Sequence, residues 1–532
     1  MNLIDDPWLP LRHRDGGVVY GPPSAMADPA VVDLAFPRAD FNGAGWQLLI
    51  GLLQTVFAPA NRKEWLRLWE EPPAREDLQA ALAPFREAFE LLGEGPRFMQ
   101  DLDPLEDARE ASVASLLIEA PGEQGLKFNT DHFVKRGIGE TMCPGCAAMG
   151  LFTKQTTGPA GGTGYRVGIR GGGPLTSLVL PHDPDASLWQ KLLLNLLPRD
   201  HDTFRYPDPG PDDWRVFPWL GPTRTSEKGS PTPVTTPEDA HPLHVFWATP
   251  SRIRLEADED EGRCQVCGGE TGTSIRRLRV TNLGYNYDGA WIHPLTPYRA
   301  DTKKPEQAPI SLKGQQGGLG YRHWESLTLE DTQDRGNLPA LVVRDYIHTK
   351  QRTLKGAKQA RLWVFGYDLK QNKPRGWYST EMPLIAVSEA RADVFLHLVR
   401  ELEQTAEKTA WQTREAVKAA WFSRPADVRG DFDFIQHRFW EATAQAFYSA
   451  LADLAAAVED GAADLPPWIA RQWREAIRGA ANEVFEDLAL SGEAEAMDLK
   501  RVIAARNKLR GWLAGGKEMK TLRRQAEQEE IA

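Results

Sequence analysis

Cysteine is scarce in this chain: four thiols are spread over 532 residues, too few for a framework of disulfide bonds. The sequence also lacks an apolar run of the roughly 20 residues that a membrane-spanning helix needs, because Gln47, Gln54 and Thr55 interrupt its most apolar early stretch. No basic segment followed by a long apolar segment opens the chain, so we expect no secretory signal. Together these absences predict a soluble, cytoplasmic chain that has no membrane partner.

An overall excess of positive charge is missing as well. Lys and Arg number 63 against 74 Asp and Glu, which leaves a formal net charge of −11. This balance excludes a uniformly basic nucleic-acid coat, but it allows local basic patches. Hydrophobic residues make up 41% of the chain, which is typical of globular proteins, and the length suggests roughly two to four domains.

The familiar catalytic motifs are absent too. The sequence contains neither HExxH nor GxSxG, and its glycine-rich stretch is not followed by the Gly-Lys-Ser/Thr of a phosphate-binding loop. The short cluster Asp200-His201-Asp202 is more typical of a polar surface, and His293, among aromatic residues and prolines, is more typical of a core. These observations lower the expectation of an enzyme.

The hydrophobic pattern of the sequence changes near residue 383. In the first part Trp46, Leu49, Ile50 and Leu53 follow the spacing of one helical face. Short β-like runs come later, at 244–247, 276–281, 340–343 and 362–367. After residue 383 four or so long amphipathic helices are joined by short links. The sequence therefore predicts an α+β fold, with a mixed α/β N-terminal domain over residues 1–382 and a C-terminal four-helix bundle over 383–532.

All four cysteines fall in two CxxC pairs, Cys143/Cys146 and Cys264/Cys267, each with glycine in or after it. Two such knuckles supply the four thiolates of a tetrahedral Zn²⁺ site, whose filled shell is typical of a structural ion. The pairs lie 118 positions apart, far beyond the roughly 15–20 of a compact zinc ribbon. We therefore predict one structural zinc per chain that clamps distant segments together. The alternative is two unrelated thiol pairs.

Glycines crowd into residues 158–173, where Arg166 and Arg170 are interleaved with them. Backbone this bare can approach a phosphate, sugar or base edge closely, although a surface loop would look the same. A second feature is the segment 350–375, which holds eight cations and one acid. It fits phosphate contacts, or else a solvated basic face, and residues 364–378, which overlap its end, are typical of a hairpin with a polar tip.

Several stretches of the chain resemble one known family. The opening MNLIDDPWLPLR, the stretch GGTGYRVGIRGGGPLTSL, the segment YDGAWIHPLTPYR and the helical C-terminal part are similar, in this order, to the large subunit (CasA) of the type I-E CRISPR Cascade complex. The resemblance implies a non-catalytic subunit that recognises the protospacer adjacent motif in double-stranded DNA. It further implies that the subunit helps to open the duplex for guide RNA and recruits a helicase-nuclease, alongside other Cascade subunits.

The resemblance also assigns roles to residues of this chain. The loop that enters the DNA minor groove matches Gly161, Gly162, Thr163 and Gly164, and the wedge that parts the first base pairs is similar to Lys370, Gln371 and Asn372. The segment that contacts the 5′ handle of the guide RNA is similar to Phe128, Asn129 and Thr130. The family's lysine that contacts the motif aligns near Asn282, so this chain has no matching lysine there. Arg277 or Arg279 could take the place of that lysine.

Two other classes of function stay open at this point. One is a zinc-dependent nucleic-acid-processing enzyme such as a deaminase, although no HxE motif precedes the first knuckle at a suitable spacing. The other is a zinc-stabilised scaffold without a nucleic-acid role. Bulky substitutions at Gly161 or Gly164 are expected to separate these readings, by leaving the fold intact while abolishing motif-dependent DNA binding.

Overall fold

The computed structural model describes residues 1–121, 127–128, 136–159, 161–354, 360–370, 372–491 and 498–528. The chain divides into two compact units. The first comprises Met1–Gly314, Glu330–Lys358 and Leu362–Ser379, and the second comprises Gln315–Leu329, Gln359–Arg361 and Thr380–Ala532. Among the described residues, no helix has the length and apolar character needed to cross a membrane.

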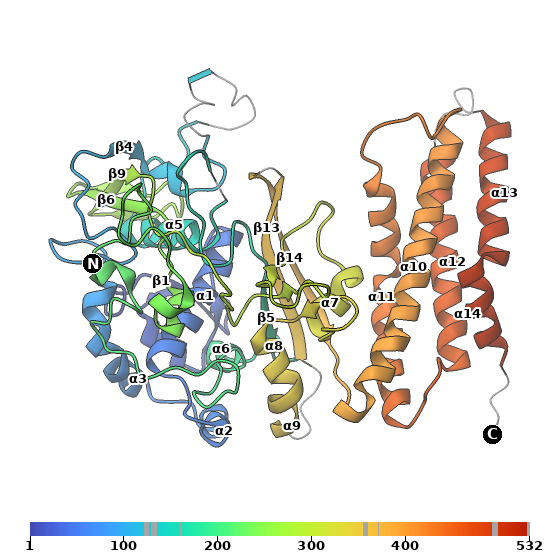
Figure 1. Ribbon diagram of the computed structural model, residues 1–532, viewed down its shortest axis with the longest axis horizontal. Helices are drawn as coiled ribbons and strands as arrows, with labels where there is room; N and C mark the ends of the chain where they lie inside the picture. The colour runs from blue at the N-terminus through green and yellow to red at the C-terminus, as the bar shows by residue number, and fades with distance from the viewer. Residues whose placement is uncertain are drawn as a thin grey trace. The chain divides into compact units, whose positions relative to one another are not determined.

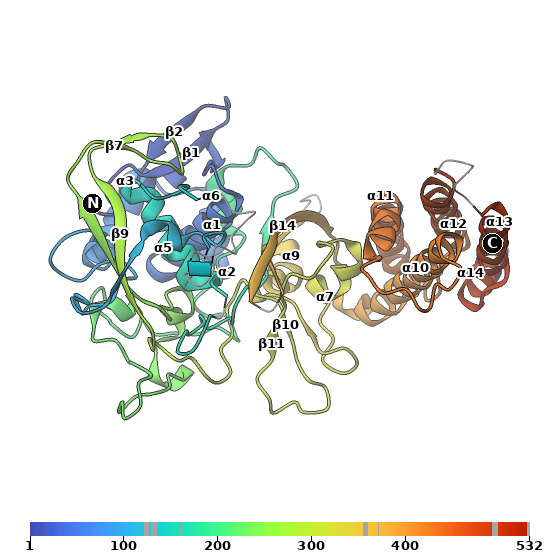
Figure 2. The same ribbon diagram turned by 90° about the horizontal axis from the view of Figure 1, so that it is seen from above.

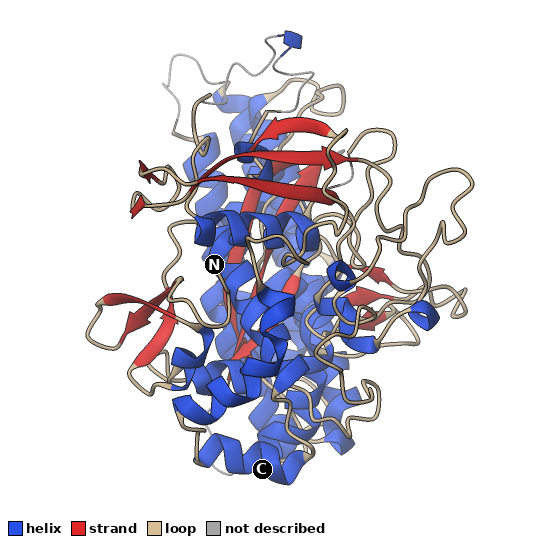
Figure 3. Ribbon diagram, turned by 90° about the vertical axis from the view of Figure 1, so that its left-hand side faces the viewer, coloured by secondary structure: helices blue, strands red, loops and turns tan. Residues whose placement is uncertain are grey.

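The first unit combines helices with small sheets (Figure 1, Figure 3). Its helices are α1 Ala39–Val56, α2 Arg62–Glu70, α3 Arg75–Leu82, α5 Pro144–Thr157, α6 Leu188–Leu193, α8 Leu341–Asp345 and α9 Gln351–Thr353. Its strands are β1 Leu9–His13, β2 Val18–Gly21, β3 Val31–Leu34, β4 Arg109–Ser112, β5 Thr176–Leu180, β6 Arg252–Asp258, β7 Gly262–Arg263, β8 Glu270–Thr271, β9 Ser274–Thr281, β10 Tyr298–Arg299, β11 Ile310–Ser311 and β12 Asn337–Leu338. Two longer strands, β13 Ala360–Lys370 and β14 Lys373–Leu384, lie mostly in this unit.

Helix α1 is the buried centre of this unit. The residues whose spacing predicted it, Trp46, Leu49, Ile50 and Leu53, are all buried, so that prediction is confirmed. The helix packs against α5 and α6. At Gly43 it also meets strand β13 so closely that a Cβ atom would lie 2.6 Å from the ring of Phe365. A helix apolar on nearly all sides is expected to lie inside a large core.

The strands pair in small sheets that bring distant segments together. One sheet has the order β4-β9-β6, with β9 in the centre, and another has the order β14-β13-β5. Strands β9 and β13 confirm the predicted runs at 276–281 and 362–367. Within the first sheet, Val280 lies between Arg109 on one side and Ile253 on the other.

Two predicted β-like runs were wrong. Residues 242–246 form a 3₁₀ helix, with Pro242 in its first turn and the His241 ring accepting from the backbone N–H of Leu243. Residues 341–345 form α8. A short buried apolar run carries no periodicity that separates strand from helix, and in both places a proline just before the run favours a helix start.

The second unit is built from helices, which Figure 2 shows nearly end on. They are α7 Trp324–Thr328, α10 Ala392–Trp421, α11 Asp433–Glu459, α12 Pro467–Ala489, α13 Leu499–Gly515 and α14 Lys517–Glu527. Where four or so helices were predicted after residue 383, the described residues form five. The last two follow one another across Gly516, with α13 packing against α10 and α14 packing against α12.

A short segment before the bundle belongs to it structurally. The ring of Tyr321 stacks on Phe447 with 4.3 Å between ring centroids, and its hydroxyl lies 2.8 Å from Oγ1 of Thr443. Nearby, the buried carboxylate of Glu325 pairs with Arg400 at 2.9 Å. These contacts explain why Gln315–Leu329 groups with the helices rather than with the residues that precede it.

Candidate metal centre and nucleic-acid interface

The structure brings the two cysteine pairs together in the first unit. Cys143 is the N-cap of α5 and Cys146 lies in its first turn, whereas Cys264 and Cys267 flank the turn between β7 and β8. In that turn Gly268 adopts a positive φ of 74°, a conformation that side chains disfavour, and its N–H donates to the oxygen of Cys264 at 2.9 Å. The second pair therefore lies in a tight turn, and the first pair lies at the start of a helix.

Backbone hydrogen bonds hold the knuckles in register independently of any ion. The N–H of Met142 donates to the oxygen of Ile275, and the N–H of Ile275 donates back to Met142, both at 2.9 Å. The N–H of Gln265 donates to the oxygen of Thr141 at 2.9 Å. These backbone contacts hold the segments of the two cysteine pairs side by side.

The four sulfur atoms fit a tetrahedral ion. They all lie within 4.8 Å of one another, and the Sγ atoms of Cys143 and Cys267 are 3.9 Å apart. A tetrahedral ion at about 2.3 Å from each sulfur requires sulfurs separated by about 3.8 Å. Hydrogen bonds from Cys143 and Cys146 lower the pKa of Cys267 to about 7 and also lower that of Cys264, whereas hydrogen bonding to Cys143 raises the pKa of Cys146. The cluster is compatible with a structural metal, which would cross-link α5 to the β7–β8 turn.

The glycine loop, residues 161–164, is held by the end of strand β9. The N–H of Leu283 donates to the oxygen of Gly164 at 2.9 Å, and the side-chain amide of Asn282 donates to the oxygen of Thr163 at 3.0 Å. Leu283 itself has a positive φ of 64°, which is rare for a bulky residue. Two hydrogen bonds therefore anchor this exposed loop to the residues that follow β9.

The three glycines of this loop have different surroundings. A Cβ atom at Gly161 would lie 2.5 Å from the ring of Tyr165, and Gly164 has a φ of +82° and neighbours at 3.2 Å. At Gly162 a Cβ atom would meet nothing within 4 Å. Bulky substitutions at Gly161 or Gly164 would therefore disturb the loop itself, and whether the rest of the fold stays intact remains a prediction.

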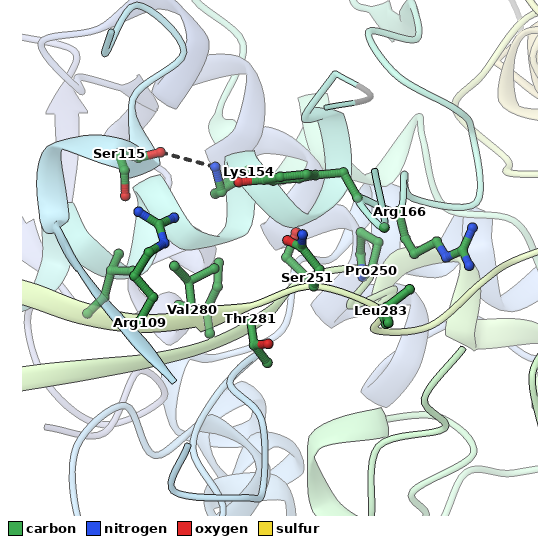
Figure 4. A pocket seen from close by; sticks show the side chains of 14 residues that line it. Arg109, Ser115, Lys154, Arg166, Pro250, Ser251, Val280, Thr281 and Leu283 are labelled. Carbon is green, nitrogen blue, oxygen red and sulfur yellow. Dashed lines mark hydrogen bonds between the residues drawn. The ribbon is translucent and has the colours of Figure 1, made fainter. Parts of the chain in front are cut away.

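A cavity opens beside the glycine loop (Figure 4). It has a volume of about 40 Å³, and the described residues that line it include the three cations Arg109, Lys154 and Arg166 but no Asp or Glu. Lys154 lies in the last turn of α5 and donates to the oxygen of Ser115 at 3.1 Å. Burial, followed by repulsion from Arg109, lowers the pKa of Lys154. The cavity is thus an electropositive recess.

The arginines singled out in the sequence are engaged within the protein. Arg170 is buried and donates to Oε1 of Gln47 at 2.7 Å, so it belongs to the core. On β9, Arg277 pairs with Asp258 at 3.2 Å, and Arg279 pairs with Glu256 at 2.6 Å. Strand β6 supplies both carboxylates, so the charge of these two arginines is largely balanced across the sheet.

The basic segment 350–375 is less basic at its surface than its composition suggests. Lys350 is buried and pairs with Asp345 at 2.7 Å, so the prediction that it belongs to a phosphate-contacting patch was wrong. Arg361 pairs with Glu381, and Arg375 pairs with Asp368. The cations at 355 and 358 lie outside the described residues.

The predicted hairpin within that segment is confirmed by β13 and β14. Lys370 and Lys373 are exposed on either side of its tip, and Asn372 has the positive φ of 64° that asparagine tolerates in tight turns. Gln371 lies outside the described residues. Of the predicted RNA-contacting residues, Phe128 is exposed, whereas Asn129 and Thr130 also fall outside the described part of the chain.

Sequence reasoning missed Lys154, Arg109 and the role of Asn282 beneath the glycine loop. Lys154 carried a weak signal, because it lies in a helix that ends directly before the glycine-rich stretch. Arg109 carried none, since strand pairing alone brings it opposite Val280.

Comparisons with known proteins agree along nearly the whole chain. The family model for the CRISPR-associated protein Cse1 matches residues 2–484. A crystal structure of CasA from Thermus thermophilus has 19% identity and a TM-score of 0.68, with 97% of this chain and 99% of that chain covered. Thermobifida fusca Cse1 has 17% identity and a TM-score of 0.69, with 99% of both chains covered. A chain from a structure titled CRISPR RNA-guided surveillance complex has 17% identity and a TM-score of 0.67, over 97% of this chain and 99% of that one.

Proposed function

Because the chain belongs to the CRISPR-associated Cse1 family, we propose that it is a non-catalytic subunit of an RNA-guided surveillance complex that recognises a short motif in double-stranded DNA. A similar fold in a structure named for such a complex supports the assembly. The glycine loop is the observation that supports the recognition role. Asn282, directly after β9, holds the loop by a hydrogen bond, and a Cβ atom at Gly162 would meet nothing within 4 Å.

The loop suits the minor groove of DNA. Backbone without side chains at Gly161, Gly162 and Gly164 can approach base edges that a bulky residue could not reach. The minor groove largely distinguishes A·T from G·C pairs, so recognition by this loop would accept several related motifs. Arg277 and Arg279 are the candidates for an added cation at the motif, and their pairing with β6 implies that DNA would have to compete with Glu256 and Asp258.

The hairpin tip is the candidate wedge that opens the duplex. Lys370 and Asn372 lie where β13 gives way to β14, and a polar tip made by these two residues with Gln371 could stack beneath the last intact base pair. The exposed Lys370 and Lys373 would then contact the phosphates of the separated strands. Once the strands part, guide RNA can pair with the target, as in other RNA-guided systems in which protein reads the motif and RNA reads the sequence.

Further partners follow from the same proposal. Phe128, Asn129 and Thr130 would contact the 5′ handle of the guide RNA, and Phe128 already offers an exposed ring for stacking. The N-terminal domain, 1–382, would carry DNA recognition and the zinc site, with the bundle, 383–532, as a separate domain. Other Cascade subunits and a helicase-nuclease would dock on surfaces of this chain.

The metal in this proposal is one structural Zn²⁺ bound by Cys143, Cys146, Cys264 and Cys267. Four thiolates are the ligand set of structural zinc, and when bound the ion supplies cross-linking stability. A zinc-dependent nucleic-acid-processing enzyme is the second candidate function. Four cysteine ligands leave no position for the water that such an enzyme activates, so the ligand set favours the first proposal.

The test compares the reconstituted complex with and without this chain. Short duplexes that differ only in the three base pairs beside the target are titrated at one fixed salt concentration. The proposal expects the chain to make affinity depend on those three pairs. A gain in affinity that is equal for every duplex would contradict it and would leave a scaffold or a non-specific clamp.

A further inference from the structure

The cavity beside the glycine loop has the composition of an anion site. None of the 14 described residues that line it is acidic, and they include Arg109, Lys154 and Arg166. In Figure 4, Lys154 and Arg109 direct their nitrogen atoms toward the same end of the cavity, beside Ser115, whereas the guanidinium of Arg166 extends away at the other end. Arg166 donates to Oγ of Ser226 at 2.8 Å, so it links the residues after the glycine loop to the segment around Ser226.

Lys154 is the unusual member of this group. Its ammonium is largely buried. It donates to the backbone oxygen of Ser115 at 3.1 Å, the one acceptor that it contacts among the described residues. An ammonium has three donors, and removing it from water without a counter-charge is unfavourable. Repulsion from Arg109 adds to this and lowers the pKa of Lys154 further. An anion that accepts hydrogen bonds from Lys154 would relieve both penalties on this lysine.

The recess has room for a small oxyanion. Its volume of about 40 Å³ is roughly three times the 10–15 Å³ that one water molecule needs. Gly164 and Asn282 form part of its wall, so a group bound by Lys154 would lie beside the glycine loop. Nucleic-acid phosphates are the oxyanions expected wherever that loop meets a duplex.

We propose that Lys154 and Arg109 form a phosphate-binding site at one end of this cavity, which receives a backbone phosphate of the DNA strand that the glycine loop contacts. The identification of the phosphate as that of DNA rests on the proposed function, whereas the phosphate site itself does not. The site would fix the register of the duplex on the loop, because phosphate contacts position a protein on DNA while base contacts specify sequence.

The first test uses the full chain and inorganic phosphate. Thermal unfolding is measured with phosphate or chloride at equal ionic strength, for the wild type, Lys154→Met and Arg109→Gln. We expect phosphate to raise the Tm of the wild type and to have a much smaller effect on either variant. Arg109 is exposed, so its substitution reports on the site even if Lys154→Met fails to fold. An equal response to phosphate and chloride in the wild type, or an equal phosphate response in all three proteins, would overturn the site.

Lys191→Met is the matched control. Lys191 is also a buried lysine, and it donates to the backbone oxygen of Val32 at 2.8 Å, but it does not line this cavity. The control should retain the phosphate response of the wild type. Loss of that response in Lys191→Met as well would show that the effect reports general destabilisation, which would contradict the site.

The second test identifies the source of the phosphate. In the reconstituted complex, the slope of log Kd against log[salt] for a duplex should fall by about 0.9 in Lys154→Met, the value for one lost phosphate contact. An unchanged slope with an intact response to inorganic phosphate would overturn the DNA assignment and leave a site for free phosphate. A complex that shows no motif dependence but retains the phosphate response would contradict the proposed function and support the site.

Discussion

The side-chain amide of Asn282 donates a hydrogen bond to the backbone oxygen of Thr163 over 3.0 Å, across 119 positions of sequence. The next residue, Leu283, donates its N–H to Gly164 from a backbone conformation that leucine rarely adopts. The two residues that follow strand β9 therefore hold the glycine loop in place by hydrogen bonds. Asn282 is also the position near which the resemblance placed a DNA-contacting lysine, so in this chain that position supports the loop.

The glycines of the loop predict a contrast in stability. Gly164→Ala should lower the free energy of unfolding by roughly 1–2 kcal/mol, because an L-residue is disfavoured at a φ of +82°. Gly162→Ala should leave it unchanged, since its Cβ atom would meet nothing within 4 Å. Urea unfolding of both variants beside the wild type measures the difference. Equal losses in the two variants would contradict the described loop conformation.

Metal removal should destabilise the first unit. The purified chain is expected to contain about one zinc, and Cys264→Ser should lose it and unfold at lower temperature, because the ion joins segments 118 positions apart. Elemental analysis with thermal unfolding measures both effects. Chelation at pH 6 should strip the metal more readily than at pH 8, since protons compete for the thiolates. Protein prepared without chelator that holds no metal would refute the site.

Buried histidine predicts a loss of stability in mild acid. Burial lowers the pKa of His244 to about 4, and its ring lies 2.9 Å from the oxygen of Arg215 and 3.0 Å from the hydroxyl of Tyr287. The unfolded chain takes up this proton near pH 6.5, whereas the folded chain resists it until about pH 4. Stability is therefore retained above pH 6.5 and falls by up to about 3 kcal/mol as pH drops through this window.

The check is urea unfolding of the wild type and His244→Asn between pH 7 and pH 4. Asparagine can keep a donor toward Arg215 but does not titrate, so the variant should show a shallower decline. His293, whose pKa burial also lowers, remains in both proteins and contributes equally. Identical pH profiles would contradict the assignment to His244.

The buried pair of Lys350 and Asp345 predicts a purely structural effect. Lys350→Met should destabilise the chain by roughly 3–5 kcal/mol, because it leaves the carboxylate of Asp345 buried without a counter-charge. Adding Asp345→Asn should recover part of this loss. Thermal unfolding measures both, and the slope of DNA affinity against salt should stay at the wild-type value in the double variant. A reduced slope there would restore Lys350 to the DNA-contacting residues.

The sequence allowed prediction of features that rest on local spacing or on rare residue types. The periodicity of α1, the hairpin of β13 and β14 and the grouping of the two cysteine pairs could all be predicted in this way. The runs at 244–247 and 340–343 were not, because a few apolar residues fit a strand or a helix equally well. The burial of Lys350 and the hydrogen bonds that hold the glycine loop depend on long-range packing, which no local pattern records.

The most direct test of the account is the DNA specificity of the complex carrying Gly162→Asp. This position has open space around it, so its substitution is expected to preserve the Tm and the metal content of the chain, with Gly162→Ala as the milder control. The account predicts at least a roughly tenfold loss, about 1.4 kcal/mol, in the affinity ratio between preferred and altered flanking base pairs. An unchanged ratio in a folded, metal-loaded variant would contradict recognition of DNA by the glycine loop.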